Sequence, residues 1–407
     1  MRLAARWIFC LAAIAQALQI AHAGDKRTPP DLRVAVFPFA NRSASSLDWI
    51  SESLAERLSD LLAASGLQVA DRDVRLEACQ RLSLPPSARL SRASLIKIAE
   101  ELDATVAVYG EFGLTAPGDA APPEPRATIR LEAACLKLAP MQLESCGVEQ
   151  GPLSQLSELQ HRLAWQILER LAPGTAPRLE DFLRENSPVR LDALENYVRG
   201  LLADTPEQKH RFLTQAARLA PGFSSPSFEL GRLNFERKQY RLAAGWLERV
   251  RPGSRQYWRA QFLLGLCRYY AGEFAAAEAV FEGLAARLPL NEVLNNLGVV
   301  QARRNRPEAL QSFMKALQGD PGDSDYNFNV ALMLWKRSDF EAAAEYFRRV
   351  LELDAEDKEA AALLERCLQK RGPRAADPRD LGRERVKLQF GERAWIELNR
   401  RLSAGSQ

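Results

Sequence analysis

A short motif, a Leu or Val followed by a Gly or Ala, recurs at nearly constant spacing through the second half of this 407-residue chain. Its four copies are Leu230-Gly231, Leu264-Gly265, Leu297-Gly298 and Val330-Ala331. A period of about 34 residues is typical of helical hairpins that stack in tandem, because no single hairpin buries its apolar face alone. The repeat therefore predicts an all-α solenoid for this half of the chain.

Other positions repeat in the same register. A small residue and an aromatic residue follow the motif by 12 and 16 positions, as Ala277 and Phe281 after Gly265, and again after Ala331. This pattern resembles the tetratricopeptide repeat (TPR) family. The resemblance implies a right-handed solenoid over 190–370, with four clear repeats, one degenerate first repeat and a capping helix.

In the TPR family, the first helices of the repeats line a concave groove that binds peptides. The residues at these inward positions are the candidate partner-binding residues: Phe228, Arg232, Phe235, Phe262, Tyr269, Tyr270, Asn295, Asn296, Arg303, Phe328, Asn329, Trp335 and Lys336. Asn side chains bond an extended backbone, and aromatic faces hold apolar or cationic side chains. The alternative is that the aromatic residues pack between repeats and the polar ones are merely solvated. The lysines of a carboxylate-binding clamp are absent at the matching positions, so we do not expect a full clamp.

The first half of the chain has a different pattern. It alternates short β-rich segments at 33–39, 67–70 and 105–110 with helical stripes at 47–64, 74–82, 91–102 and 154–171. A β-hairpin is expected from 127–138 and 143–148, and a Pro- and Ala-rich loop at 115–126. The segments "RVAVFPFANRS" and "ATVAVYGEF" resemble the TolB amino-terminal-like domain. That resemblance covers 31–171 and implies an α/β unit with a mixed sheet and no catalytic site. The fold class expected for the whole chain is thus α+β, with this α/β domain followed by the solenoid.

Two cysteines fall on the predicted hairpin. If residues 139–142 form its loop, Leu138 faces Leu143 and Cys135 lies directly opposite Cys146. Cβ atoms in such a pair are about 4.5–5.5 Å apart, near disulfide range. We therefore expect a disulfide between Cys135 and Cys146. Two buried, reduced thiols are the alternative, and a one-residue shift of register would separate the side chains.

The N-terminus has the features of a signal peptide. Arg2 and Arg6 precede a short apolar run, and Ala21-His22-Ala23 forms a small-residue cleavage site. We expect cleavage after Ala23 and a periplasmic or secreted protein. A retained membrane anchor is the alternative, but the apolar run is too short to span a bilayer. We expect no transmembrane segment in the mature chain.

The remaining features bear on function. The net charge of +3 does not favour nucleic acid as a partner. No phosphate-binding glycine loop, nucleophile elbow or zinc-protease motif occurs, so we expect no enzyme, cofactor or metal site. A linker is expected at 172–189, and a basic tail at 371–407 with a short amphipathic helix near 392–402 that docks loosely, or contacts the envelope peripherally.

Together these features predict a scaffold of the bacterial envelope that binds a protein or peptide partner in the concave groove. A structural subunit of an envelope or outer-membrane assembly machine is the alternative, and an enzyme in the N-terminal domain a remote one.

Overall fold

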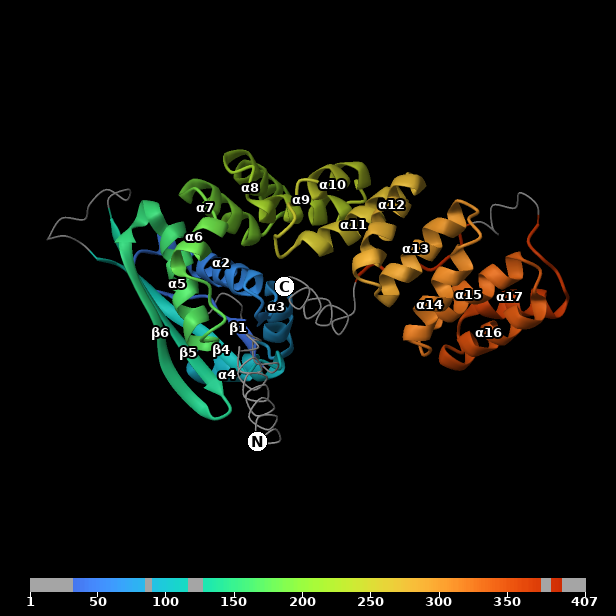
Figure 1. Cartoon of the computed structure of the whole chain (residues 1–407), viewed down its shortest axis with the longest axis horizontal. Helices are drawn as coiled ribbons and strands as arrows, with labels where there is room; N and C mark the ends of the chain where they lie inside the picture. Colours follow the sequence, from blue (N-terminus) through green and yellow to red (C-terminus); the bar gives the residue numbers. More distant parts are fainter. Residues whose placement is uncertain (1–31, 85–89, 116–126, 375–381, 390–407) are drawn as a thin grey trace, which may run out of the picture. The chain divides into compact units, whose positions relative to one another are not determined.

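The computed structural model describes residues 32–84, 90–115, 127–374 and 382–389 (Figure 1). It divides into two compact units, Met1–Pro188 and Val189–Gln407. The expected fold class is confirmed, since a mixed sheet with helices is followed by a helical solenoid. The expected signal peptide, the loop at 116–126 and the amphipathic stretch at 392–402 lie outside the described residues. Among the residues described, no helix combines the length and apolarity needed to cross a membrane.

The first unit is built on a mixed sheet with the strand order β3-β1-β4-β5-β6. Parallel pairs join β1 to β3 and to β4, and antiparallel pairs join β4 to β5 and β5 to β6. The short β2 pairs in parallel with β4. The strands span Arg33–Val36 (β1), Ala40–Asn41 (β2), Gln68–Val69 (β3), Val106–Thr115 (β4), Thr128–Leu138 (β5) and Met141–Pro152 (β6).

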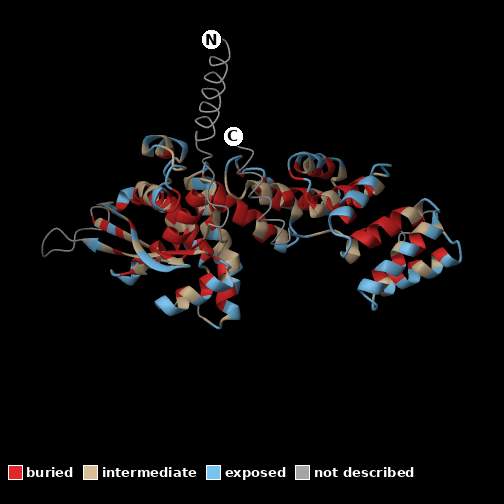
Figure 2. Cartoon of the chain, turned by 60° about the horizontal axis from the view of Figure 1, so that its bottom comes forward, coloured by how far each residue is buried: buried red, intermediate tan, exposed pale blue. Residues whose placement is uncertain are grey.

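Helices cover both faces of the sheet centre. Ala35 and Phe37 pack with Ile98 of α4, while Val34 and Val36, which point the other way, are also buried. Burial of both faces explains why β1 is apolar without alternation. Figure 2 shows this buried layer between the helices and the sheet. The helices span Trp49–Ala64 (α2), Arg72–Arg81 (α3), Arg92–Glu101 (α4) and Leu156–Leu171 (α5), with 3₁₀ turns at Ser45–Leu47 (η1) and Leu153–Gln155 (η3).

Two expectations for this unit are wrong. The hairpin loop is Ala139-Pro140 alone, because the strands pair up to Leu138 and Met141, so the register assumed from a loop at 139–142 is shifted. The segment expected as a linker contains α6 (Leu179–Glu185), whose Phe182 is only 2% exposed. Trp165 of α5 also donates a 2.8 Å hydrogen bond to the Pro177 carbonyl, which packs this segment into the first unit.

The second unit is a tandem series of helical hairpins. Within residues 189–374, all of which are described, five hairpins are followed by a single helix. The helices span Leu191–Leu201 (α7), Pro206–Leu219 (α8), Ser224–Glu236 (α9), Tyr240–Leu247 (α10), Tyr257–Tyr270 (α11), Phe274–Arg287 (α12), Asn291–Arg303 (α13), Ala309–Gly319 (α14), Ser324–Lys336 (α15), Phe340–Leu353 (α16) and Lys358–Leu368 (α17).

The repeated small residues lie where the two helices of a hairpin cross. A Cβ placed on Gly265 in α11 would approach the Phe281 ring of α12 to 2.7 Å, and one on Gly298 would approach the Phe313 ring to 2.7 Å. The missing Cβ therefore makes room for the aromatic ring of the second helix. This is the physical reason for the repeat that the sequence displays.

Candidate functional site

Three of the candidate groove residues belong to the core. Phe262 is 2% exposed and meets Phe281 edge to face at 5.8 Å. Phe228 is buried in the apolar cluster of α9, α10 and α11. Trp335 is fully buried and its Nε1 donates a 2.8 Å hydrogen bond to the Arg371 carbonyl. For these three residues the packing alternative is correct.

A second group forms an aromatic cluster around α9, α10 and α11. Phe235 meets Tyr240 edge to face at 5.6 Å, and Tyr240 stacks on Tyr270 at 4.9 Å. Tyr269 contacts Tyr270 at 5.2 Å, and Tyr270 remains 39% exposed. The neighbouring Arg232 lies over the Phe228 ring and forms an ion pair with Glu229 at 3.4 Å. Phe235, Tyr269 and Tyr270 thus form one aromatic cluster in which Tyr270 is partly exposed.

The remaining candidates surround an extended segment of the chain itself. Gly382–Gln389 runs along α13 and α15 of the second unit, far from them in sequence (Figure 1). Its first residue, Gly382, lies against the Arg303 guanidinium, which a Cβ at this position would overlap. Gly382 also has a φ of +71°, so both the space and the backbone conformation favour glycine.

Three buried asparagines hold the backbone of this segment. Asn329 accepts a 2.8 Å hydrogen bond from the Arg385 N–H and donates a 2.8 Å bond to the Arg385 carbonyl. Asn296 makes the same pair of bonds with Lys387, at 2.9 and 2.8 Å. Asn295 donates to the Arg385 carbonyl and accepts from Asn329, which fixes the orientation of both amides. We call Asn295, Asn296 and Asn329 the amide ladder.

The amide ladder relates the repeat of the solenoid to the two-residue repeat of the extended segment. Asn296 and Asn329 occupy the same position in consecutive repeats, and they bond residues 385 and 387. In an extended chain, every second residue presents its N–H and carbonyl to the same side. One repeat of the solenoid therefore corresponds to two residues of the bound segment.

Carboxylates at helix N-termini bind the side chains of the segment. Asp323 caps α15 with Oδ1, which accepts from the Tyr326 N–H at 3.1 Å, while its Oδ2 accepts from Lys387 Nζ at 2.7 Å. Asp357 caps α17 with Oδ1 and accepts from Arg385 Nη2 with Oδ2 at 2.6 Å. Each aspartate thus has one oxygen for the helix and one for the segment.

A second acidic residue follows each cap by two positions. Asp325 accepts from Lys387 Nζ at 2.7 Å and pairs with Arg385 at 3.4 Å. Glu359 pairs with Arg383 at 2.9 Å. We call Asp323, Asp325, Asp357 and Glu359 the acidic row. Its two halves lie at the same position of consecutive hairpins, so the row follows the repeat as the amide ladder does.

Aromatic faces complete the contacts of the basic side chains. The Arg385 guanidinium carbon lies 3.7 Å from the centre of the Phe328 ring, and Lys387 Nζ lies 5.0 Å from that of Tyr326. Cation–π contacts of this kind contribute most where water is excluded. Phe328 is fully buried, so its role is to support Arg385 rather than to hold an apolar ligand.

The side chains between the basic positions point to the other side of the segment. Val386 packs against the apolar clusters of α11 to α15, as Tyr269 also does. Glu384 is buried and forms an ion pair with Lys336 at 2.6 Å. Burial raises the pKa of Tyr269 to about 12, and the Glu384 charge contributes in the same direction.

The charges in the groove stabilise one another. Burial alone would raise the pKa of Asp357, but the Ala360 N–H and the Arg385 guanidinium hold it below its usual value. Burial would likewise lower the pKa of Lys387, but its hydrogen bonds to Asp323 and Asp325 raise it. Both groups are therefore charged at neutral pH, and the contacts are ion pairs.

Sequence reasoning identified part of this site. It selected the amide ladder, Phe328, Arg303 and Lys336, but it missed the acidic row and the segment itself. The basic tail expected at 371–407 was not assigned to the groove, yet its residues 382–389 are bound along it. Two signals were present: an acidic pair that recurs one repeat later, and the alternation of basic residues in "RERVK".

The second unit consists of tandem helical hairpins that repeat the same helix crossing, and their first helices line one groove. The second unit has a tetratricopeptide-repeat fold. No model of a known protein family matches the chain, and no curated protein matches it.

Solved structures resemble parts of the chain. YrrB, described as a TPR protein with an unusual peptide-binding site, is 17% identical over 43% of this chain and 92% of its own, with a TM-score of 0.40. MamA from Desulfovibrio magneticus RS-1, from residue 41 to its end, is 22% identical over 39% of this chain and 92% of its own, with a TM-score of 0.36. At these TM-scores, the fold assignment rests on the repeats and hairpins of the chain itself.

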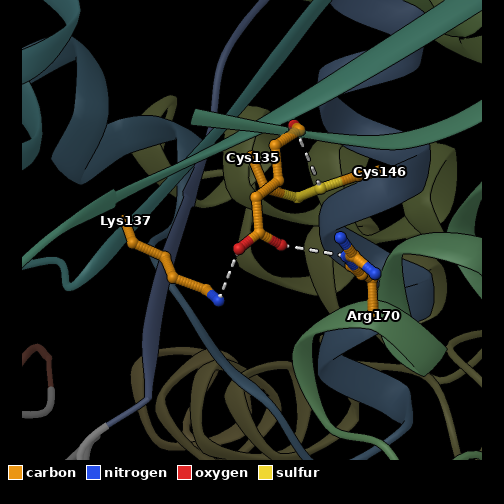
Figure 3. The surroundings of a disulfide bond; sticks show 5 residues. Cys135, Lys137, Cys146 and Arg170 are labelled. Atoms are coloured by element: carbon orange, nitrogen blue, oxygen red, sulfur yellow. Dashed lines mark hydrogen bonds and ion pairs between the residues drawn. A yellow bond between two sulfur atoms is a disulfide. The ribbon is translucent and has the colours of Figure 1, made fainter. Parts of the chain in front are cut away.

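In the first unit, Cys135 and Cys146 are joined by a disulfide, with Cα atoms 5.7 Å apart. They are not directly opposite each other, because Cys135 faces Glu144. A β-bulge between Ala133 and Ala134 leaves Cys146 between two paired residues of β6 and brings it beside Cys135. Glu144 also bonds Lys137 and Arg170, which flank the disulfide in Figure 3.

The first unit also contains buried polar groups between its helices. His161 of α5 is 1% exposed, and its Nε2 accepts a 3.0 Å hydrogen bond from Arg57 of α2. Burial and the Arg57 charge lower the pKa of His161 to about 3. A neutral histidine that is closed to solvent and already bonded is poorly suited to acid–base catalysis. Elsewhere in the described residues, no group of three or more His, Cys, Asp or Glu is placed to hold a metal ion.

Proposed function

We propose that this chain is a non-catalytic interaction scaffold whose TPR unit binds an extended segment of a partner polypeptide. The observation that carries the proposal is the amide ladder, in which Asn296 and Asn329 each bond both backbone groups of one residue. Backbone hydrogen bonds give affinity for an extended chain, while the surrounding side chains give specificity. Such an arrangement binds a polypeptide and leaves it chemically unchanged.

We further propose that the scaffold is exported to the bacterial envelope. The support is the N-terminal sequence, with Arg2 and Arg6 before a short apolar run and a cleavage site at Ala23. The disulfide between Cys135 and Cys146 suits an oxidising compartment. Cell fractionation and N-terminal sequencing test this proposal: we expect a periplasmic or secreted chain that starts at Gly24, and a cytosolic chain that keeps residues 1–23 contradicts it.

The first unit is proposed to be a TolB amino-terminal-like domain that docks a second component. Its support is the sequence resemblance of the segments "RVAVFPFANRS" and "ATVAVYGEF". The groove of the second unit is filled by the chain itself when no partner is present. That occupancy favours an exchangeable binder over a permanent subunit of an assembly machine.

The test selects extended peptides from a random displayed library on the full chain carrying Arg385→Ala and Lys387→Ala, which removes the side-chain ion pairs of the chain's own segment and weakens its hold on the groove. Binding of the selected peptides is then measured by titration after adding Asn329→Ala. Asn327→Ala is the matched control, because Asn327 lies on the same helix and is also buried, but among the described residues its side chain bonds the Pro321 and Asp323 carbonyls and not the segment.

We expect Asn329→Ala to weaken binding by about tenfold, because it leaves the two backbone groups of one peptide residue unpaired. Asn327→Ala should leave the affinity of the folded protein unchanged. Equal affinity of the Asn329→Ala and Asn327→Ala variants contradicts the proposed function, since the amide ladder would then not be the binding surface.

A further inference from the structure

We propose that the groove selects a partner segment with basic side chains at every second position, and that Gly382–Gln389 is a built-in competitor for that partner. The inference rests on the proposed function and names the class of its partner. It follows from how the acidic row is spaced relative to the amide ladder.

The spacing of the acidic row selects the basic positions. The amide ladder presents alternate residues of a bound segment to the same side, and the acidic row lies along that side. In the chain's own segment the three residues facing it are Arg383, Arg385 and Lys387. A segment shifted by one residue would present its intervening side chains to four carboxylates instead. The acidic row therefore fixes both the charge and the register of the ligand.

The opposite side of the groove selects the intervening positions. The site that holds Val386 is lined by the apolar clusters of α11 to α15, so it suits a small aliphatic side chain. At the next intervening position, Glu384 pairs with Lys336. The other oxygen of Glu384, Oε2, is buried and makes no hydrogen bond within the described residues. An unpaired buried oxygen weakens binding.

The built-in segment is therefore an imperfect ligand, which a partner that makes all its hydrogen bonds would displace. The segment competes with such a partner because it is attached to the same chain. Thirteen residues, 369–381, separate the end of α17 from Gly382. A tether of this kind gives a local concentration of about 1 mM. If the segment itself has an intrinsic Kd of about 50 µM for the groove, a free peptide would bind the intact chain about 20-fold more weakly than a chain whose segment is fully released.

The experiment measures fluorescence anisotropy of labelled peptides added to the full-length chain. The probe has the sequence of residues 382–389, GRERVKLQ. A neutral peptide, GAEAVALQ, replaces the three basic residues with alanine. The release variant carries Arg385→Ala and Lys387→Ala. Its matched control is Leu388→Ala, because Leu388 lies in the same segment but is 54% exposed.

A second variant removes charge from the acidic row without removing the helix caps. Asp323→Asn and Asp357→Asn are added to the release variant, because asparagine caps a helix about as well as aspartate. A weaker affinity in this variant then reports the lost charge rather than an unravelled helix, and circular dichroism verifies that the helices persist.

We expect the release variant to bind GRERVKLQ about sevenfold more tightly than the wild type or the Leu388→Ala chain, because a segment weakened about tenfold still competes in part for the groove. We expect the neutral peptide, or the two asparagine substitutions, to weaken this binding by about tenfold. Equal binding of the basic and neutral peptides overturns the inferred partner class and leaves the proposed function standing. Equal binding of the wild type and the release variant overturns the competitor role. Failure of both peptides to bind the folded release variant overturns the proposed function as well.

Discussion

The close approach of the two helices in each hairpin predicts opposite effects for two glycine substitutions in the same repeat. Gly265 of α11 faces Phe281, and a Cβ there would lie 2.7 Å from Cζ and 2.8 Å from Cε2 of the ring. Gly283 of α12 is exposed, and a Cβ there would meet nothing within 4 Å. Carbon atoms in contact are normally about 3.5–4.0 Å apart. Alanine therefore fits at Gly283 and overlaps the ring at Gly265.

The magnitudes follow from helix propensity and overpacking. Gly283→Ala should raise the free energy of unfolding by about 1 kcal/mol, the difference in helix propensity. Gly265→Ala has the same propensity gain, but overpacking a core costs about 1–3 kcal/mol, so the net change is a loss of about 0–2 kcal/mol. The two variants should therefore differ by about 1–3 kcal/mol.

The assay is urea unfolding of the full chain followed by circular dichroism, comparing midpoints at unchanged slope. Phe281→Leu provides a further check, because its shorter side chain leaves room for a Cβ and should reduce the cost of Gly265→Ala. Equal stabilisation by both alanine substitutions would refute the reasoning, since the glycine would then not be required by the helix approach. The natural Ala331 opposite Phe347 shows that one hairpin accommodates a methyl group at this position.

Three further predictions concern other parts of the chain. Because the folded pKa of His161 is about 3 and its ordinary value is 6.5, this side chain binds a proton in the unfolded first unit that it does not bind in the folded one, so the contribution of His161 to stability should fall by about 1.4 kcal/mol per pH unit as pH drops from 6.5 towards 3. Glu56 of the same unit, whose folded pKa is raised to about 8, shifts stability in the opposite direction, so the His161 contribution is measured as the difference in urea unfolding between the wild type and His161→Gln at each pH; a difference that does not change with pH contradicts the assignment. Alkylation of the unreduced, denatured chain followed by mass spectrometry should leave Cys135 and Cys146 unlabelled, and labelling of both contradicts the disulfide. Trp335→Phe should lower stability by about 1 kcal/mol through the lost hydrogen bond but leave the peptide affinity of the groove unchanged, whereas reduced affinity at full stability would return Trp335 to the binding surface.

The fold of the second unit was predictable because its determinants are local and repeated. The spacing of Gly265, Ala277 and Phe281 specifies a helix crossing within one hairpin, and the same crossing recurs in later repeats. The repeat also placed Asn296 and Asn329 on the groove. It did not separate them from Phe262, because the first helix of a repeat also packs against the next hairpin, and position alone does not decide burial.

The occupied groove was not predictable from local patterns. It depends on contacts between Gly382–Gln389 and residues such as Asn296, which lies 91 residues before Lys387. The register of the hairpin that holds Cys135 was missed because the loop was taken to have four residues, whereas Leu138 pairs with Met141 across a loop of two. The β-bulge between Ala133 and Ala134 has no clear signal in alternation, and it leaves Cys146 beside Cys135 on the buried side although the two are not paired.

The pairing of one repeat with two residues of ligand has a consequence for how such a scaffold changes over evolution. Duplicating or deleting a hairpin that carries both an asparagine and an N-terminal aspartate would lengthen or shorten the recognised sequence by two residues, without altering which face of the ligand is bound. The number of partner residues that the protein recognises would therefore change in steps of two as repeats are gained or lost. A longer protein of this kind would still select basic residues at every second position.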